Sequence, residues 1–322
     1  MKYDNTTQYK IEDLTERQIL IGYRVLLSAS SLIGDTLILV GSLRYNAIKL
    51  HKIIVIFVQH MAVADLLLTL FGIIPGAVSL GANDWILGDV MCYLSYFVKD
   101  TSAVVLYMMT TAIAMTKMLI IKNPLSAFNS SSKAGHIAAF SMWIAGSSLP
   151  AAALAKDNRS MYFDYLLYVC DYTCVKPVWN NTSYLIYTTM VGLVVLVTIA
   201  GTVVSSVVLL VLAKRATVGR PEGLQWQGVL TVLLTAGAHT LLALPVTIYY
   251  IVARFCKDPT NFYRYAFWIT HLVVVVNFYI FGLTLPSFRD FLKKLVGCVS
   301  SSNEGERIRE SEDRQGLLDV HS

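Results

Sequence analysis

Seven long apolar stretches run through the 322-residue sequence, and most are interrupted by a single polar residue near their middle. A helix needs roughly 20 apolar residues to cross the ~30 Å hydrocarbon core of a bilayer. The pattern therefore predicts an all-α membrane protein, a seven-transmembrane helix bundle with its termini on opposite sides of the membrane. The predicted spans are about Ile19–Leu43, Ile53–Leu80, Met91–Ile121, His136–Ala155, Tyr184–Ala213, Gly228–Val252 and Tyr265–Leu285.

Composition agrees with a membrane protein. Charged residues make up 15% of the chain, against about 25% in soluble domains. The mean hydropathy is +0.57. The net charge is +5, and the basic residues flank the spans. That placement suits anionic lipid headgroups better than nucleic acid. We therefore expect contacts with membrane lipids and no nucleic-acid partner.

Loop charge predicts the orientation. Lysine and arginine are in excess in the loops after the first, third and fifth spans and after the seventh, which places the C-terminus inside. Residues 1–18 form a predicted extracellular N-terminus without a cleavable signal peptide, and the bundle spans 19–285 at the plasma membrane. Sequons at Asn5, Asn158 and Asn181 fall on the predicted outside and are candidate glycosylation sites, although the sequon at Asn129 falls inside.

The segment after the seventh span, residues 286–298, alternates apolar and basic residues. Phe288, Phe291, Leu292 and Leu295 lie at helical spacing, which predicts an amphipathic helix on the inner leaflet. Cys298 ends this segment and is a candidate for palmitoylation, with a free cytosolic thiol as the equal alternative. Residues 299–322 are polar and charged, and we expect a disordered cytoplasmic tail.

Polar residues within apolar spans are energetically expensive, so they mark functional positions. Their order resembles the rhodopsin-like (class A) family of G-protein-coupled receptors from Ile19 to Cys298. The matching motifs are Gly34-Asp35, Met61-Ala62-Val63-Ala64-Asp65-Leu66, Trp85-Ile86-Leu87-Gly88 followed by Cys92, Trp143 with Pro150, Leu244-Pro245, Asn277-Phe278-Tyr279-Ile280-Phe281, and Phe288-Arg289.

Several motifs depart from the family pattern. The Asp-Arg-Tyr of the third helix is replaced by Thr116-Lys117-Met118, the helix-six tryptophan by Ala243, and the proline and tyrosine of the last motif by Phe278 and Phe281. The resemblance implies that Thr116, Lys117, Asn277 and Phe281 serve G-protein coupling. Lysine does not reproduce the geometry of arginine, and no acidic neighbour holds it.

The resemblance also implies a polar core of Asp35, Asp65 and Asn277. Two carboxylates in low dielectric are not both ionised cheaply, so one neutral, hydrogen-bonded Asp is favoured over two independently satisfied carboxyls. In the family this region often binds sodium with the help of hydroxyl side chains. Leu106 and Val274 occupy those positions here, which argues against sodium.

Lys99 and Lys117 are 18 residues apart, or five helical turns, so they share the face that meets the bundle interior in this family. Lys99 stands where amine receptors carry aspartate, which predicts a ligand with an acidic group. Asp100, about 100° around the helix, should point elsewhere. An intramolecular pair of Lys99 with an acidic loop residue is the alternative. The further candidate ligand contacts are Ala103, His239, Tyr249 and His271.

The resemblance further implies a disulfide from Cys92 to the long outer loop between the fourth and fifth spans. Cys174 is favoured because it lies nearer the fifth span, and Cys170 is the alternative. If Cys92 pairs with Cys174, the two remaining outer cysteines, Cys170 and Cys256, could form a second bridge. Four outer cysteines allow three pairings, so spacing alone does not choose.

These features predict a receptor that binds an extracellular small molecule or peptide and activates a heterotrimeric G protein. The alternatives are a non-signalling scavenger or accessory receptor on the same fold and, less favoured, a seven-helix transporter. No lysine occurs in the seventh span, which excludes a retinal Schiff base. We see no catalytic constellation, metal site or cofactor motif, so we do not expect an enzyme.

Overall fold

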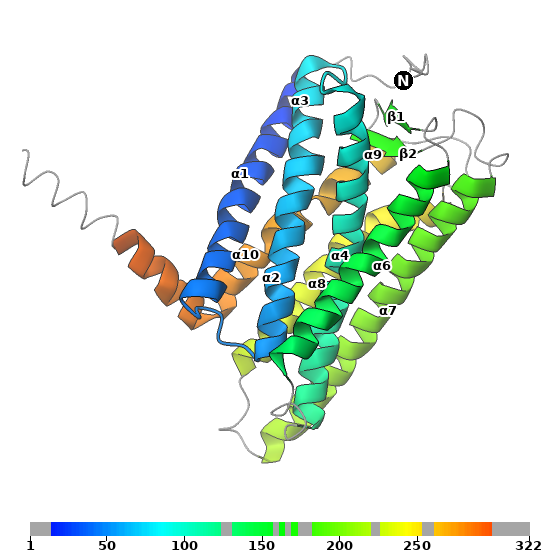
Figure 1. Cartoon of the computed structure of the whole chain (residues 1–322). Coiled ribbons are helices and arrows are strands. Elements are labelled where there is room, and N and C mark those ends of the chain that lie inside the picture. Colours follow the sequence, from blue (N-terminus) through cyan, green and yellow to red (C-terminus); the bar gives the residue numbers. More distant parts are fainter. Residues whose placement is uncertain are drawn as a thin grey trace, which may run out of the picture.

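A computed structural model of the chain describes residues 14–123, 131–156, 161–164, 169–172, 182–219, 226–252 and 261–297. Within them, seven helical spans are long and apolar enough to cross a membrane, which confirms the predicted fold class. The spans lie side by side as one elongated bundle (Figure 1). Their elements are α1 (Leu14–Arg44), α2 (Lys52–Leu68) with η2 (Thr69–Ile73) and α3 (Ile74–Ala82), α4 (Gly88–Lys122), α6 (Ser132–Lys156), α7 (Thr182–Gly219), α8 (Trp226–Val252), and α9 (Asn261–Thr270) with α10 (Val273–Thr284).

Helix α4 is the centre of the bundle, because it contacts α2, α6, α7 and α8. One end of the bundle carries a short antiparallel hairpin that the sequence did not predict, β1 (Met161–Asp164) paired with β2 (Val169–Tyr172). We call this the hairpin end. At the opposite end the chain enters a further helix at residues 286–297. The two ends are the top and the bottom of Figure 1.

The second span contains an irregular turn. Pro75 lies in the first turn of α3, and proline has no N–H to donate to the carbonyl four residues earlier, that of Phe71. A π-helical turn, η2, occupies this place. The hydroxyl of Ser95 on α4 donates to the Phe71 carbonyl at 2.6 Å. The distortion is therefore fixed by a side chain from the neighbouring span.

The seventh span is broken at His271. The backbone N–H groups of His271, Leu272, Val274 and Val275 all bond to carbonyls three residues earlier, which tightens the chain between α9 and α10. Pro245 lies inside α8, and Thr270 donates to the carbonyl of Leu242, three residues before that proline, at 2.8 Å. A side chain beside the break of the seventh span therefore bonds to the backbone of α8.

The helix at residues 286–297 has the predicted amphipathic character. Phe288 and Phe291 are buried, whereas Arg289, Lys293 and Lys294 are exposed. The Phe288 ring meets Phe278 of α10 at a centroid distance of 6.1 Å. Leu295, expected on the apolar face, is 40% exposed. The predicted glycosylation sites, Cys298 and the tail lie outside the described residues.

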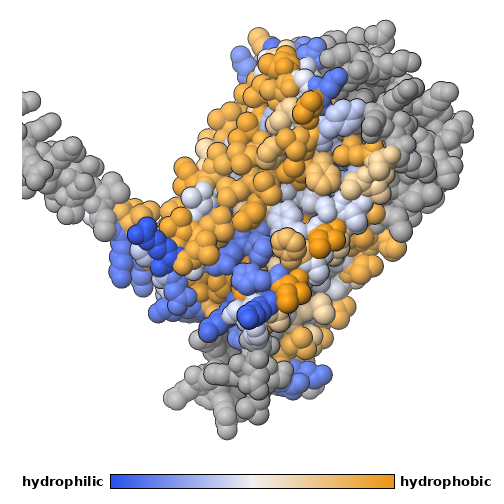
Figure 2. Space-filling model, in the orientation of Figure 1, coloured by the Kyte–Doolittle hydropathy of each residue, from blue (hydrophilic) through white to orange (hydrophobic). Residues whose placement is uncertain are grey.

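The outer surface of the bundle is apolar. Leu26 of α1 and Val204 of α7 are more than half exposed, as lipid-facing residues of a membrane protein are. Figure 2 shows hydrophobic side chains along most of the visible face and hydrophilic ones gathered around the helix at 286–297. The polar and charged side chains that are buried lie inside the bundle, among them Arg24, Asp35, Asp65, Lys99 and Lys117.

Candidate functional site

A disulfide joins Cys92, in the first turns of α4, to Cys170 in β2. The tether from Cys92 to the long loop is thus confirmed, but Cys174 as its favoured partner is wrong. With Cys170 engaged, the proposed Cys170–Cys256 bridge is also wrong. The reason is the hairpin: its register pairs Phe163 with Cys170, and it brings Cys170 against α4. Distance along the chain to the fifth span did not decide the pairing.

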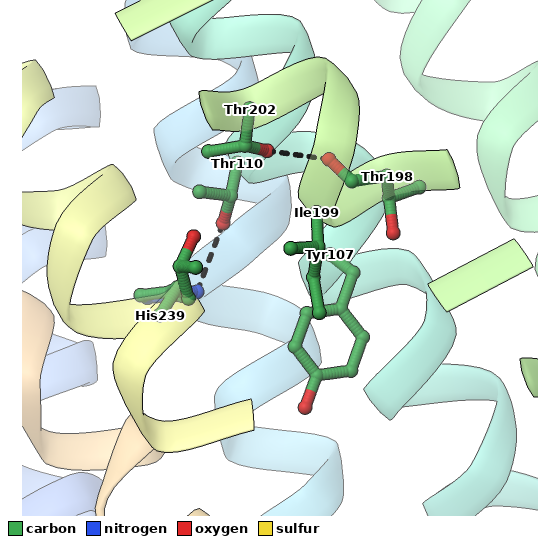
Figure 3. Close-up of a pocket in the computed structure, with 7 residues that line it drawn as sticks. Tyr107, Thr110, Thr198, Ile199, Thr202 and His239 are labelled. Atoms are coloured by element: carbon green, nitrogen blue, oxygen red, sulfur yellow. Dashed lines mark hydrogen bonds between the residues drawn. The ribbon is translucent and has the colours of Figure 1, made fainter. Parts of the chain in front are cut away.

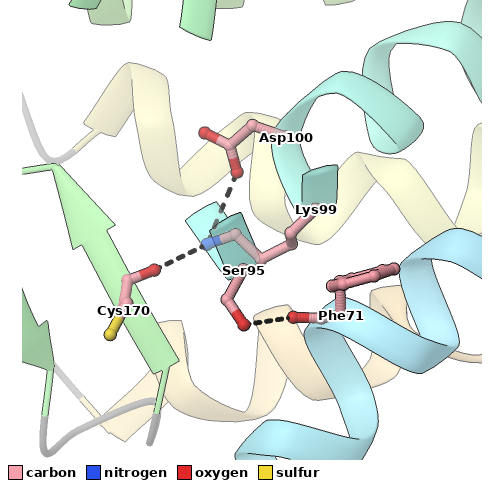
Figure 4. A network of polar contacts seen from close by, with 5 residues as sticks. All are labelled: Phe71, Ser95, Lys99, Asp100 and Cys170. Atoms are coloured by element: carbon pink, nitrogen blue, oxygen red, sulfur yellow. Dashed lines mark hydrogen bonds and ion pairs between the residues drawn. The ribbon is translucent and has the colours of Figure 1, made fainter. Parts of the chain in front are cut away.

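Lys99 is buried near this disulfide, and its side chain is 7% exposed. Its Nζ lies 3.4 Å from Oδ1 of Asp100 and donates to the Cys170 carbonyl, also at 3.4 Å. Figure 4 shows the ammonium between these two groups. The expectation that Asp100 points elsewhere is wrong, because the four-carbon lysine stem is long enough to reach around the helix to its neighbour. The intramolecular pair therefore exists, with a helix residue instead of a loop residue.

The irregular turn of the second span makes room for Lys99. A Cβ placed on Gly72 would lie 3.3 Å from Cγ of Lys99 and 3.7 Å from its Cβ. Gly72 belongs to η2, whose geometry is held by the bond from Ser95 to Phe71 (Figure 4). Gly72 and Ser95 thus place the lysine, and the sequence pattern did not single out either residue.

Arg24 is a second buried cation at the hairpin end and was missed by the sequence analysis. It is 3% exposed, and its Cζ lies 5.4 Å from the centroid of the Trp268 ring. His271, a predicted ligand contact, is also buried, and its ring meets Phe267 edge-on at a centroid distance of 4.5 Å. The signal was present in the sequence, because Arg24 is a lone basic residue inside the first apolar stretch.

A directed chain of hydrogen bonds crosses the middle of the bundle. His239 lies 2.9 Å from the Thr110 hydroxyl through Nδ1 and 3.1 Å from Oδ1 of Asn277 through Nε2. The amide nitrogen of Asn277 donates to Oδ2 of Asp65 at 2.9 Å. Since Oδ1 of Asn277 can only accept, Nε2 of His239 is the donor to it. The Thr110 hydroxyl, which faces Nδ1, also donates to the Leu106 carbonyl at 2.9 Å, so its single proton serves two acceptors. The chain links α4, α8, α10 and α2.

Asp35 and Asp65 are both fully buried, as the predicted polar core requires. Ser31 donates to Oδ2 of Asp35 at 2.7 Å and lies 2.7 Å from the Thr69 hydroxyl. Among the described residues, Oδ1 of each Asp has no hydrogen-bond partner. That one of the two carboxyls is neutral stays a prediction.

His239 also borders a small, partly open cavity of about 10 Å³ between α4, α7 and α8, which is close to the least that one water molecule needs. Figure 3 shows the hydroxyls of Thr110 and Thr202 and the Tyr107 ring around it. The predicted ligand contact His239 therefore lies in the bundle interior, bonded to Thr110 and Asn277. Ala103 is half-buried on α4. Tyr249 lies in α8, and its side chain is outside the described part of the chain.

The end opposite the hairpin holds three of the positions predicted for G-protein coupling, Thr116, Lys117 and Phe281, whereas Asn277 lies in the middle of the bundle. Lys117 is 8% exposed, and a Cβ placed on Gly228 of α8 would lie 3.1 Å from its Nζ. Within the described residues Lys117 forms no ion pair. Thr116 is half-buried, and Phe281 is 1% exposed. Helices α8 and α10 are joined here by a 2.8 Å hydrogen bond from Thr231 to Thr284.

These features are those of a seven-helix receptor: seven helices of membrane length, a disulfide at one end of the bundle, and a polar interior that leads to the opposite end. The family model of the 7 transmembrane receptor (rhodopsin family) matches residues 34–280. The chain belongs to this family. Membership places it among multi-pass membrane receptors rather than enzymes.

Its relatives include receptors for peptides. A QRFP-like peptide receptor of Branchiostoma floridae is 26% identical over 209 residues, which cover 64% of this chain and 54% of the relative. Neuropeptide Y receptor type 5 of Rattus norvegicus is 26% identical over 178 residues, covering 54% of this chain and 38% of the relative. The chain thus spans about half the length of the first of these relatives and less of the second.

Proposed function

We propose that the protein is a plasma-membrane receptor, with the hairpin end outside the cell, that binds a ligand with an acidic group and activates a heterotrimeric G protein. The observation that carries the ligand class is Lys99, a buried cation beside the hairpin. Its contacts with Asp100 and Cys170 are both 3.4 Å long, whereas charge-assisted bonds are ordinarily about 2.7–2.9 Å. A ligand carboxylate at the shorter distance would replace the Asp100 contact.

The peptide receptors among its relatives support a peptide as one form of this ligand, and an acidic small molecule is the other. Activation would be a population shift between two packings of the bundle, driven by the ligand's higher affinity for one of them. Lys117 would lie in the crevice that opens to the G protein. Because no acidic residue at position 116 holds it, we expect measurable basal activity.

The first test is guanine-nucleotide exchange without ligand, measured against each class of G protein. Exchange above the receptor-free background, lowered by Lys117→Ala, is the expected result. Lys122→Ala removes an exposed lysine from the same helix and should leave exchange unchanged. The observation behind the alternative, a non-signalling scavenger receptor, is Lys117, which replaces the family's arginine. Absence of exchange with every G protein and every ligand tried would support that alternative.

The second test uses a panel of acidic and cationic compounds and peptides at matched surface expression. An acidic activator should lose about one to two decades of potency in Lys99→Ala, as expected for one charge-assisted hydrogen bond. Lys99→Asp should weaken it further. A cationic activator that is indifferent to Lys99→Ala would contradict the acidic-ligand proposal.

A further inference from the structure

Arg24 is a buried guanidinium on the inner face of α1, between Leu20 and Leu27, and its position is fixed by the neighbouring span. Its neighbour Tyr23 donates to the backbone carbonyl of Trp268 at 2.7 Å. Nearer the end of the bundle, Tyr265 donates to Oε1 of Glu16 at 3.3 Å. These two bonds set the register of α1 against α9. The register keeps Arg24 over the Trp268 ring, 5.4 Å from its centroid.

The Trp268 side chain presents a polar group without a partner. Its indole nitrogen is buried, the residue is 4% exposed, and no acceptor among the described residues bonds to it. A buried donor without an acceptor destabilises the folded state, because the group has lost its hydrogen bonds to water and gained none in return. The indole can only donate. The indole of Trp268 therefore needs an acceptor. The guanidinium of Arg24 beside it has five N–H groups and can only donate as well.

The third member of the group is His271, at the break between α9 and α10. Its ring meets Phe267 edge-on at a centroid distance of 4.5 Å, and Nζ of Lys99 lies 5.9 Å from the centroid of the same Phe267 ring. Arg24 and Lys99 belong to α1 and α4, so two cations approach the break of the seventh span from two different helices. Asp100 is the carboxylate paired with Lys99, and it belongs to the α4 side.

We infer that Arg24, the indole N–H of Trp268 and His271 form a binding site for an anionic group, a carboxylate or a phosphate, between α1 and the break of the seventh span. The guanidinium fork matches both groups with two parallel bonds, and the indole supplies a further donor. The site deepens the proposed function, because it gives an acidic ligand an anchor that is separate from Lys99. Arg24 also has contacts within the chain, which a bound anion would share or displace.

The test uses the full-length receptor in phosphatidylcholine nanodiscs, without G protein. Thermal stability and tryptophan fluorescence are titrated with sodium acetate and, separately, with inorganic phosphate, against sodium chloride of equal ionic strength. The wild type should be stabilised by saturable anion binding. Arg24→Gln should raise the half-saturating concentration roughly 10- to 100-fold. Trp268→Phe keeps the aromatic ring under Arg24 and removes the N–H, so it should raise that concentration about 2- to 10-fold.

Two further variants separate charge from geometry. Arg24→Lys retains the charge but loses the fork, so its binding should fall between wild type and Arg24→Gln. Arg44→Gln removes an arginine from the same helix that also lies over an aromatic ring, Tyr45 at 5.8 Å, but is exposed. It should titrate like the wild type. If Arg24→Gln does not fold, Arg24→Lys and Trp268→Phe still decide the outcome.

A second arm identifies the source of the anion. The same titrations are repeated in nanodiscs that contain phosphatidylserine. If a lipid headgroup occupies the site, this lipid should stabilise the wild type, leave Arg24→Gln unchanged and abolish the response to soluble anions. That result would support the site, with a lipid as its occupant. Equal responses of wild type and Arg24→Gln to acetate, phosphate and phosphatidylserine would overturn the inference. Since no G protein is present, a receptor that binds the anions but never evokes exchange would keep this site and contradict only the proposed signalling.

Discussion

At the scale of single residues, His239 links three spans through its two ring nitrogens. It stands on α8 and bonds to Thr110 on α4 and Asn277 on α10. In the resemblance to the rhodopsin-like family, α8 has lost its tryptophan to Ala243, one turn away. The histidine therefore supplies a polar link between three spans where an aromatic side chain would supply packing.

We predict that His239→Leu lowers the free energy of unfolding in detergent, because Asn277 Oδ1 loses its donor. Thr110 loses its link to α8 but keeps its bond to the Leu106 carbonyl. Interhelical hydrogen bonds in membranes are worth about 0.6 kcal/mol, up to ~1.7. A double-mutant cycle of His239→Leu with Thr110→Val should give a coupling energy in that range. His136→Leu, at an exposed histidine of α6, is the control and should change stability by less than about 0.5 kcal/mol. Strict additivity of the two substitutions would show that the bond contributes nothing.

At the scale of secondary-structure elements, α1 and α10 approach closely at one glycine. A Cβ placed on Gly34 would lie 2.8 Å from both Cβ and Cγ of Phe278. Small residues at helix crossings allow such approach in membranes. Phe278 follows Asn277 directly, so the contact also fixes the height at which Asn277 meets Asp65.

Gly34→Ala should destabilise the receptor by about 1–3 kcal/mol, since the added methyl forces the two helices apart. Gly22→Ala is the matched control, because it lies on the same helix and a Cβ there would meet nothing within 4 Å. In that open position alanine should be neutral or stabilise the helix by roughly 0.5–1 kcal/mol. Unfolding in detergent measures both. Equal effects of the two substitutions would contradict the close α1–α10 contact.

At the scale of the whole molecule, the Cys92–Cys170 bridge joins residues 78 apart in sequence and holds the hairpin against α4. It also places the Cys170 carbonyl on Lys99. The bridge thus connects the stability of the hairpin end to the arrangement of the ligand-binding lysine.

Peptide mapping without reduction should recover Cys92 linked to Cys170. Cys92→Ser and Cys170→Ser should each destabilise the receptor by about 2–5 kcal/mol, as loss of a native disulfide does, and weaken an acidic activator. Cys174→Ser should retain the bridge and the activator's potency. Recovery of a Cys92–Cys174 peptide would refute the pairing seen in the structure.

The sequence by itself determined the seven spans and their approximate ends, because each must carry about 20 apolar residues and satisfy its own backbone. It also marked Lys99, Lys117, Asp35, Asp65 and Asn277, since a charged or polar side chain in hydrocarbon is rare without a reason. Arg24 could have been found by the same rule. The amphipathic helix at residues 286–297 followed from its apolar and basic spacing alone.

Only the tertiary structure decided which of these groups meet. The Cys170 pairing depends on the register of a hairpin, and the Lys99–Asp100 contact on how a long, flexible side chain folds back along its helix. The stacking of Arg24 on Trp268 depends on the register of α1 against α9, two helices that lie nearly the whole chain apart in sequence. Helical periodicity gives the face on which a side chain lies. The height and the rotation at which two helices pack are set by the contacts between them, and these contacts cannot be predicted from the sequence of either helix alone.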